Sequence, residues 1–119
     1  DRVENIRRIA NVSKLMLDAG LITIVSFIAP FRAERDLAKG LMGNDILEVF
    51  IDVPIEVAES RDPKGLYKKA RSGVLKNFTG IDSPYEKPEN PDIHIESDKV
   101  SAEEAAEIIV KKLLQKEII

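Results

Sequence analysis

The chain has 119 residues, of which 44% are hydrophobic and 33% are charged, and this composition fits one folded domain rather than two domains or a disordered chain. The formal net charge of −3 argues against a dedicated nucleic-acid-binding protein, because such proteins are usually basic. The absence of cysteine and the single histidine, His94, exclude a disulfide scaffold, a thiolate zinc site, a cysteine nucleophile and a multi-histidine metal site. No apolar run approaches the roughly 18–20 residues that span a bilayer, and no leader precedes the first helical pattern, so we expect a cytoplasmic protein.

The first half of the chain alternates predicted helices with apolar strands. Apolar residues at helical spacing predict three helices, over residues 1–19, 31–41 and 55–60. Two β-branched and mostly apolar runs are typical of strands buried on both faces, namely residues 21–28 (LITIVSFI) and 46–53 (ILEVFIDV). Gly20 ends the first helix and Pro30 ends the first strand.

Composition changes at Arg61. Four of the six prolines and three of the six glycines lie between residues 63 and 91, and residues 61–76 carry six basic side chains against one acidic side chain. Long loops of this kind inside compact domains are usually functional or disordered, so we predict a mobile lid over about 61–91, which includes a short helix over 64–72. A strand over 92–95 follows, and Ser101 with Glu104 forms a capping box that starts the last helix.

This order of elements predicts an α/β fold of three layers (αβα) in which helices cover both faces of a parallel sheet of three strands. Ligands bind such sheets at the carboxyl ends of the strands. A basic lid closing over that edge suits a highly anionic small ligand and would exclude water. The alternative is a solvated basic surface, and the charge pattern alone does not decide between the two.

Several single residues allow both a functional and a structural interpretation. Arg2 and Asn5 share one face near a helix start, which suits an anion, but they could also be an idle surface pair. Phe78 could be a stacking platform for a base or a core residue, and we favour the core from its position alone. We expect His94 to be structural, and Asp52 could hold a metal-bound water or cap the following helix. The patterns G-x-x-x-x-G-K-[ST] and G-x-S-x-G do not occur in these residues.

Longer motifs resemble one known family. The chain resembles adenylylsulfate kinase (APS kinase) from Asp1 to about Ile95, in the segments DRVENIRRIANVSKL, SFIAPFRAERD, FIDVPIEVAESRDPKGLYKKARSG and KNFTGIDSPYEKPENPDIHI. The resemblance implies a P-loop nucleotide kinase fold and the transfer of the ATP γ-phosphate, with Mg²⁺, to the 3′-hydroxyl of adenosine 5′-phosphosulfate (APS). The product would be 3′-phosphoadenosine 5′-phosphosulfate (PAPS), formed in sulfate activation and assimilation.

The resemblance also implies roles for individual residues. It implies that APS is bound by Arg2, Asn5, Ile28, Lys64, Leu66 and Phe78. Ile28 and Phe78 would lie around the APS adenine, Lys64 and Leu66 would contact APS from the lid, and Arg61 would pack against the ATP adenine. No metal ligand is implied within these residues.

Two departures from the family qualify these expectations. The family's N-terminal segment, with its first strand and phosphate-binding loop, has no counterpart in residues 1–119, so we expect an incomplete domain whose catalytic groups lie in that segment, with Lys64 in a supporting role. These residues alone are therefore expected to be inactive. Ala29 stands where the family usually has serine.

Two other functions remain open at this stage. One is a related nucleoside-monophosphate kinase, which the unbroken lid motif argues against. The other is a non-catalytic nucleotide-binding or regulatory kinase-like domain of a bifunctional sulfurylase/kinase. The expected partners are APS, ATP, a second copy in a homodimer, and an ATP sulfurylase that is fused or associated. Nucleic acid and membrane are not expected partners.

Overall fold

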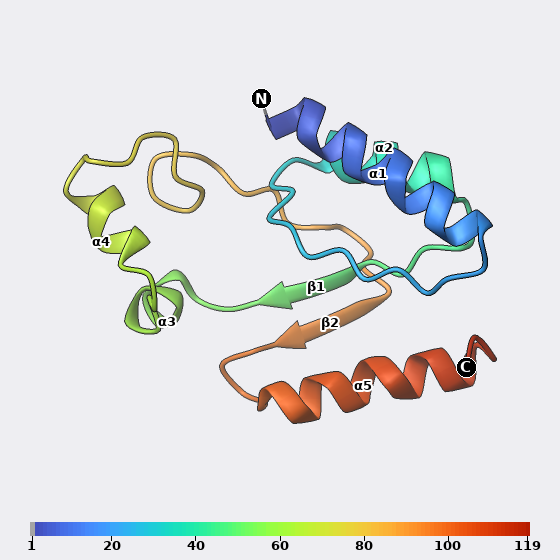
Figure 1. The fold of residues 1–119 in the computed structure, drawn as a ribbon. Coiled ribbons are helices and arrows are strands. Elements are labelled where there is room, and N and C mark those ends of the chain that lie inside the picture. Colours follow the sequence, from blue (N-terminus) through green and yellow to red (C-terminus); the bar gives the residue numbers. More distant parts are fainter. Residues whose placement is uncertain (1) are drawn as a thin grey trace. The chain divides into compact units, whose positions relative to one another are not determined.

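The computed structural model describes residues 2–119 and contains helices and a parallel sheet (Figure 1). The elements are α1 (Arg2–Asp18), α2 (Arg32–Met42), β1 (Val49–Asp52), α3 (Ile55–Ser60), α4 (Leu66–Arg71), β2 (Ile93–Glu96) and α5 (Ala102–Gln115). Every predicted helix is confirmed within a few residues at its ends, and so are the second and third predicted strands. Asp1, the first residue of the first predicted helix, lies outside the described residues.

The chain forms two compact units. The first unit comprises the chain up to Ile46 together with residues 84–88, and the second comprises residues 47–83 and 89–119. In the first unit α1 lies alongside α2 (Figure 1). The helix α1 has Glu4 in its first turn and is followed by Gly20 with a φ of +89°, a conformation that favours glycine and terminates helices.

The predicted strand over residues 21–28 is wrong for the described structure, because this segment has no regular secondary structure. A strand needs a neighbouring backbone to satisfy its N–H and C=O groups. The two strands among residues 2–119 pair with each other, and residues 21–28 pair with neither of them. Their side chains are exposed, Ile24 by 91% and Ile28 by 65%. Apolar composition therefore indicated burial that these residues do not show.

The second unit contains the sheet and the remaining helices. β1 and β2 pair in parallel, in a register that runs from Val49 opposite Ile93 to Asp52 opposite Glu96. Phe50, Ile93 and Ile95 are the buried side chains of this pair. The parallel α/β architecture is thus confirmed, with two strands in place of the predicted three. No helix within residues 2–119 is both long and apolar enough to cross a membrane.

The last helix begins as its sequence predicts. The Ser101 hydroxyl accepts a hydrogen bond from the Glu104 N–H at 3.1 Å, and the Glu104 carboxylate accepts one from the Ser101 N–H at 3.2 Å. This reciprocal pair satisfies two N–H groups that the first turn of a helix otherwise leaves open. The capping box is therefore confirmed in both of its hydrogen bonds.

Candidate functional site

Arg2 and Asn5 lie in the first turns of α1, and both are exposed. Residues three apart on a helix share a face, so the structure confirms the placement that the sequence predicts for this pair. Their proposed contact with APS remains a prediction. The helix places an arginine and an amide side chain side by side, which is a suitable arrangement for binding an anionic group.

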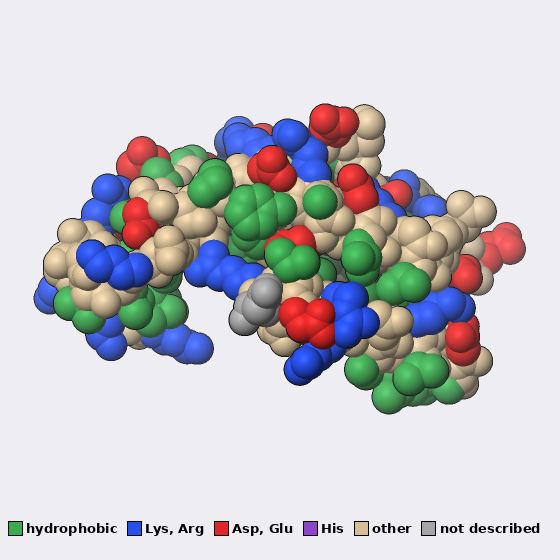
Figure 2. All heavy atoms as spheres, turned by 90° about the horizontal axis from the view of Figure 1, so that it is seen from above, with side chains coloured by type: hydrophobic (Ala, Val, Ile, Leu, Met, Phe, Trp, Pro, Cys, Tyr) green, Lys and Arg blue, Asp and Glu red, His purple; other side chains and the backbone are tan. Residues whose placement is uncertain are grey.

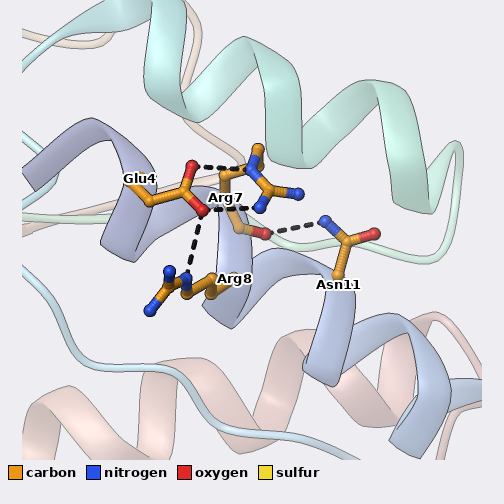
Figure 3. A network of polar contacts seen from close by, with 4 residues as sticks. All are labelled: Glu4, Arg7, Arg8 and Asn11. Atoms are coloured by element: carbon orange, nitrogen blue, oxygen red, sulfur yellow. Dashed lines mark hydrogen bonds and ion pairs between the residues drawn. The ribbon is translucent and has the colours of Figure 1, made fainter.

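The next residues of α1 form an ion-pair network around one carboxylate (Figure 3). Glu4 accepts hydrogen bonds from Arg7 at 2.6 and 2.8 Å and from Arg8 at 3.1 Å. The Arg7 guanidinium, and then that of Arg8, lower the pKa of Glu4 to about 2, and the same contact raises the pKa of Arg7. The Asn11 amide donates to the Arg7 carbonyl at 2.8 Å. The positive charges of Arg7 and Arg8 are therefore engaged locally with Glu4.

The groove between α1 and α2 contains a buried carboxyl group that sequence reasoning missed. It has a volume of about 330 Å³ and is lined by Val3, Ile6, Arg7, Phe31, Ala33, Glu34 and Leu37. Glu34 is only 4% exposed, and neither of its carboxylate oxygens has a hydrogen-bond partner among residues 2–119. A buried polar group without a partner costs free energy. The sequence carries no local signal for the burial of Glu34, because Glu34 is one of several charged residues in the first eight positions of α2.

Ile28 and Ala29 belong to the segment between α1 and α2. Ile28 is exposed, like the rest of residues 21–28, and its contact with the APS adenine remains a prediction. Ala29 has a φ of +40°, a conformation that is uncommon for residues other than glycine. Its carbonyl accepts a hydrogen bond from Arg35 Nη1 at 2.6 Å. Ala29 is thus a strained point of the backbone.

The predicted lid starts in the tight turn that joins the short helices α3 and α4. Arg71 on α4 forms a two-pronged ion pair with Glu59 on α3, at 2.6 and 3.2 Å, which lowers the pKa of Glu59. Asp62 accepts hydrogen bonds from the Leu66 N–H at 2.8 Å and the Lys68 N–H at 3.3 Å. Asp62 therefore caps α4, a role that an aspartate shortly before a helix favours but that the sequence analysis missed.

The lid residues expected to bind nucleotides lie around this turn. Lys64 is exposed in the turn between α3 and α4, and Leu66 begins α4. Arg61 is also exposed and donates from Nη1 to the Ser97 carbonyl at 3.2 Å. Figure 2 shows Lys and Arg side chains gathered at the left end of the view, where Figure 1 draws α3 and α4. The cationic surface predicted for this segment is therefore present.

Phe78 is held by a compact loop. The Asp82 carboxylate accepts hydrogen bonds from the Asn77 N–H at 2.8 Å and the Phe78 N–H at 2.5 Å. The Phe78 carbonyl accepts from the N–H groups of residues 81–83, each at 3.1 Å. The Phe78 ring meets the Tyr67 ring edge to face, with centroids 5.0 Å apart at 71°. These contacts fix Phe78 in position, and its side chain is half-buried. It is thus less buried than the core residue favoured from the sequence and less exposed than a free stacking platform.

Asp82 is expected to make this loop pH-sensitive. The N–H groups of Phe78 and Asn77 lower the pKa of Asp82 below its ordinary value of 3.8, so the ionised carboxylate stabilises the folded loop. That stabilisation is complete above pH 3.8 and is lost as the pH falls through the lowered pKa. In NMR titrations, the amide protons of Asn77 and Phe78 should shift with a midpoint below 3.8. Asp82→Asn should abolish this titration and Asp98→Asn should leave it unchanged, whereas a midpoint at or above 3.8 would contradict the role.

His94 and Asp52 form a pair across the two strands. His94 Nε2 lies 2.8 Å from Asp52 Oδ2, and the imidazole stacks on Phe50 with ring centroids 5.0 Å apart. The Asp52 carboxylate bonds His94 and no N–H group of the described start of α3, so the capping role considered for Asp52 is wrong. Within residues 2–119 no group of three or more histidine, aspartate and glutamate side chains could hold a metal ion. These contacts support the structural role expected for His94.

The predicted site residues fall into both compact units. Arg2, Asn5 and Ile28 lie in the first unit, whereas Arg61, Lys64, Leu66 and Phe78 lie in the second. Within the second unit, Lys64 and Leu66 share one turn, and Phe78 packs against Tyr67 on the same short helix α4. The residues that sequence reasoning missed, Asp62 and Asp82, hold these elements in shape.

Comparison with known proteins identifies the family. The adenylylsulphate kinase family matches residues 1–96. The chain is 57% identical over its full length to an adenylyl-sulfate kinase of Clostridium acetobutylicum and 55% identical to one of Saccharomyces cerevisiae, and spans 60% of the length of each. It is also 55% identical, over 95% of its length, to the bifunctional enzyme CysN/CysC of Xylella fastidiosa, of which it spans 18%.

A solved structure extends this similarity to three dimensions. The chain superposes on the Mycobacterium tuberculosis APS kinase CysC, solved in complex with AMPPNP and APS, with a TM-score of 0.87 and 46% sequence identity. The superposition covers 97% of this chain and 67% of that one. The α/β fold with a parallel sheet is accordingly consistent with a P-loop kinase fold. With a family match over four fifths of its residues, this chain belongs to the adenylylsulphate kinase family.

Proposed function

We propose that the protein carrying this chain is an adenylyl-sulfate kinase that converts APS and ATP to PAPS and ADP. The observation that carries the proposal is the 46% identity and close superposition with an APS kinase that was solved with AMPPNP and APS. In the reaction, the APS 3′-hydroxyl loses its proton and its oxygen attacks the γ-phosphorus, while the bond from that phosphorus to the ADP oxygen breaks. Enzymes achieve such a transfer chiefly by positioning the two substrates in line and by stabilising charge.

The APS side of the site is assigned to α1 and to two apolar contacts. Arg2 donates charge-assisted hydrogen bonds to the anionic groups of APS, and Asn5 adds an amide on the same helix face. Ile28 and Phe78 lie around the adenine. This assignment is supported by the exposure of Arg2, Asn5 and Ile28 and by the loop that holds Phe78 through Asp82.

The lid is assigned to residues 61–91. Lys64 and Leu66 contact APS, Arg61 packs against the adenine of ATP, and closure of this segment excludes water from the transferring phosphoryl group. Mg²⁺ is expected to accompany ATP and to neutralise its phosphate charge. The described residues provide no cluster of metal ligands, so no step that involves the metal is assigned to this chain.

The test of the function is phosphate transfer from γ-labelled ATP to APS by the complete gene-encoded protein, with Mg²⁺ present. CMP serves as the control acceptor, because a nucleoside-monophosphate kinase would phosphorylate it. Transfer to APS and not to CMP is the expected result. Nucleotide binding without transfer to either acceptor would instead indicate a regulatory kinase-like domain.

Arg2→Ala is expected to raise the Michaelis constant for APS by roughly tenfold to a hundredfold, because a hydrogen bond to a charged group contributes about 1.5–3 kcal/mol. The Michaelis constant for ATP should change by less than a factor of about two, since Arg2 is assigned to APS alone. Steady-state kinetics with each substrate varied in turn measures both constants. Lys14→Ala, which removes a surface cation paired with Asp18 on the same helix, is the matched control. Equal effects on the two Michaelis constants would contradict an APS-side position.

Two partner assignments complete the proposal. We expect a homodimer, which analytical ultracentrifugation of the complete protein would test. Fusion to or association with an ATP sulfurylase is supported by the bifunctional relatives, CysN/CysC of Xylella fastidiosa and NodQ of a Rhizobium species, which the chain matches at 55–56% identity.

A further inference from the structure

Two segments about fifty residues apart in the sequence are joined at the start of α2. The Glu86 N–H donates to the Pro30 carbonyl at 2.7 Å. The Glu86 carboxylate in turn accepts the Arg32 N–H at 2.8 Å, and Arg32 Nε donates to the Lys87 carbonyl at 3.0 Å. Glu86 thereby satisfies an N–H group in the first turn of α2, which has no cap from its own preceding residue, Phe31. A carboxylate at a helix N-terminus is also favoured electrostatically.

Arg35, the fourth residue of α2, makes further contacts with both of these segments. Its Nη1 donates to the Ala29 carbonyl at 2.6 Å, and its Nη2 donates to the Glu86 carbonyl at 2.5 Å. Its guanidinium carbon lies 5.7 Å from the centroid of the Tyr85 ring, within the range of cation–π attraction. The side chain is half-buried. One planar guanidinium thus links the backbone of two segments at once, as a forked donor can. We call Arg32, Arg35 and residues 85–87 together the clasp.

The clasp holds a strained point of the backbone. Ala29, with its φ of +40°, occupies a conformation that persists only where surrounding contacts over-determine it. Arg35 supplies such a contact directly on the Ala29 carbonyl. Ile28, the residue assigned to the APS adenine, immediately precedes this point. The position of Ile28 is therefore coupled to Arg35 through one peptide unit.

The clasp also anchors the chain where it leaves the Phe78 loop. Residues 84–88 belong to the first compact unit, whereas residues 47–83 before them belong to the second. The chain thus passes from the loop that holds Phe78 directly into the clasp. The clasp itself lies wholly within the first unit, as does Ile28.

We propose that Arg35 is a positioning residue for APS, which sets the geometry of the Ile28–Ala29 backbone through its hydrogen bonds to the Ala29 and Glu86 carbonyls. The proposal rests on the proposed kinase function. Arg35 touches neither the nucleotide nor the transferring phosphoryl group in this proposal, and it acts through Ala29 and Glu86. Loss of the clasp should consequently affect the binding of APS, to whose adenine Ile28 is assigned, much more than the binding of ATP.

The first experiment compares Arg35→Ala, Arg35→Lys and Lys14→Ala in the complete protein. Arg35→Ala is expected to raise the Michaelis constant for APS about tenfold, because small displacements of positioning groups carry large kinetic effects, while that for ATP stays within about twofold. Arg35→Lys should recover part of the APS affinity, since an ammonium can still donate to one carbonyl but has no planar fork. Lys14→Ala should behave as the wild type. Equal effects of Arg35→Ala on both substrates would overturn the proposal.

The second experiment measures hydrogen exchange of the Glu86 amide, which the clasp protects through Pro30. In the Arg35→Ala variant the exchange rate of this amide hydrogen should be higher than in the wild type. Faster exchange with an unchanged APS Michaelis constant would show a merely structural contact and overturn the positioning role, and so would unchanged exchange. If Arg35→Ala does not fold, the same comparison is made with Arg35→Lys. A wild-type protein that transfers no phosphate to APS would instead refute the proposed function, and the exchange data would still test the clasp.

Discussion

Replacing Phe78 with alanine is expected to weaken APS binding by about 1–3 kcal/mol, the usual contribution of an aromatic ring on which a base stacks. Because 1.4 kcal/mol corresponds to a factor of ten, the dissociation constant should rise by roughly fivefold to 150-fold. Calorimetric titration of APS into the complete protein measures the change directly. The structure favours a large effect because Asp82 holds the Phe78 backbone N–H and the edge contact with Tyr67 holds the ring, so little ordering is required on binding.

The matched control is Tyr67→Phe. It preserves the aromatic ring that contacts Phe78 at 5.0 Å and removes only the hydroxyl group. Its APS affinity should equal that of the wild type. An unchanged affinity in Phe78→Ala would refute the platform role and restore the interpretation of Phe78 as a core residue of the loop.

Glu34→Met is expected to stabilise the protein by roughly 1–3 kcal/mol, which is the cost of a buried polar group that lacks a partner. The Glu34 side chain is 4% exposed and shares its groove with apolar side chains such as Ile6 and Leu37. Methionine has a similar length and can fill an irregular apolar site without polar atoms. The free energy of unfolding, from denaturant titration of the complete protein, should therefore increase.

Glu107→Met provides the matched control, because it makes the same replacement at an exposed position of helix α5. Exposed substitutions usually change stability by less than about 0.5 kcal/mol. A loss of stability in Glu34→Met would contradict the prediction.

Local signals predicted the helices well. The Ser101–Glu104 capping box, the glycine after α1 and the proline before α3 mark helix ends through contacts within a few residues. Such contacts depend little on the rest of the fold, so they can be inferred from the sequence. The same reasoning placed Arg2 and Asn5 on one helix face. Arg2, Asn5 and Phe78 stood out from the residues alone, but their roles and the other candidate site residues came from the resemblance to a family, because single exposed cations and one phenylalanine carry no specific local signal.

The predicted strand over residues 21–28 shows the limit of such reasoning. Its composition indicates a buried strand, but strand formation depends on pairing with a neighbouring backbone, and residues 21–28 pair with none within 2–119. Asp82 and Glu34 show the same limit for side chains. Whether a carboxylate accepts loop hydrogen bonds or is buried without a partner depends on the residues that fold around it. These neighbours cannot be inferred from composition.

The sequence alone therefore determines the family, the helix boundaries and the cationic character of the predicted lid. Each of these follows from residues that are close together in the chain. Folding adds the relations between distant residues. These are the pairing of β1 with β2 over more than forty positions, the burial of Glu34 between two helices, and the clasp in which Arg35 holds Ala29 and Glu86. Such contacts arise because burial and hydrogen bonding are satisfied over the whole structure rather than within any one segment.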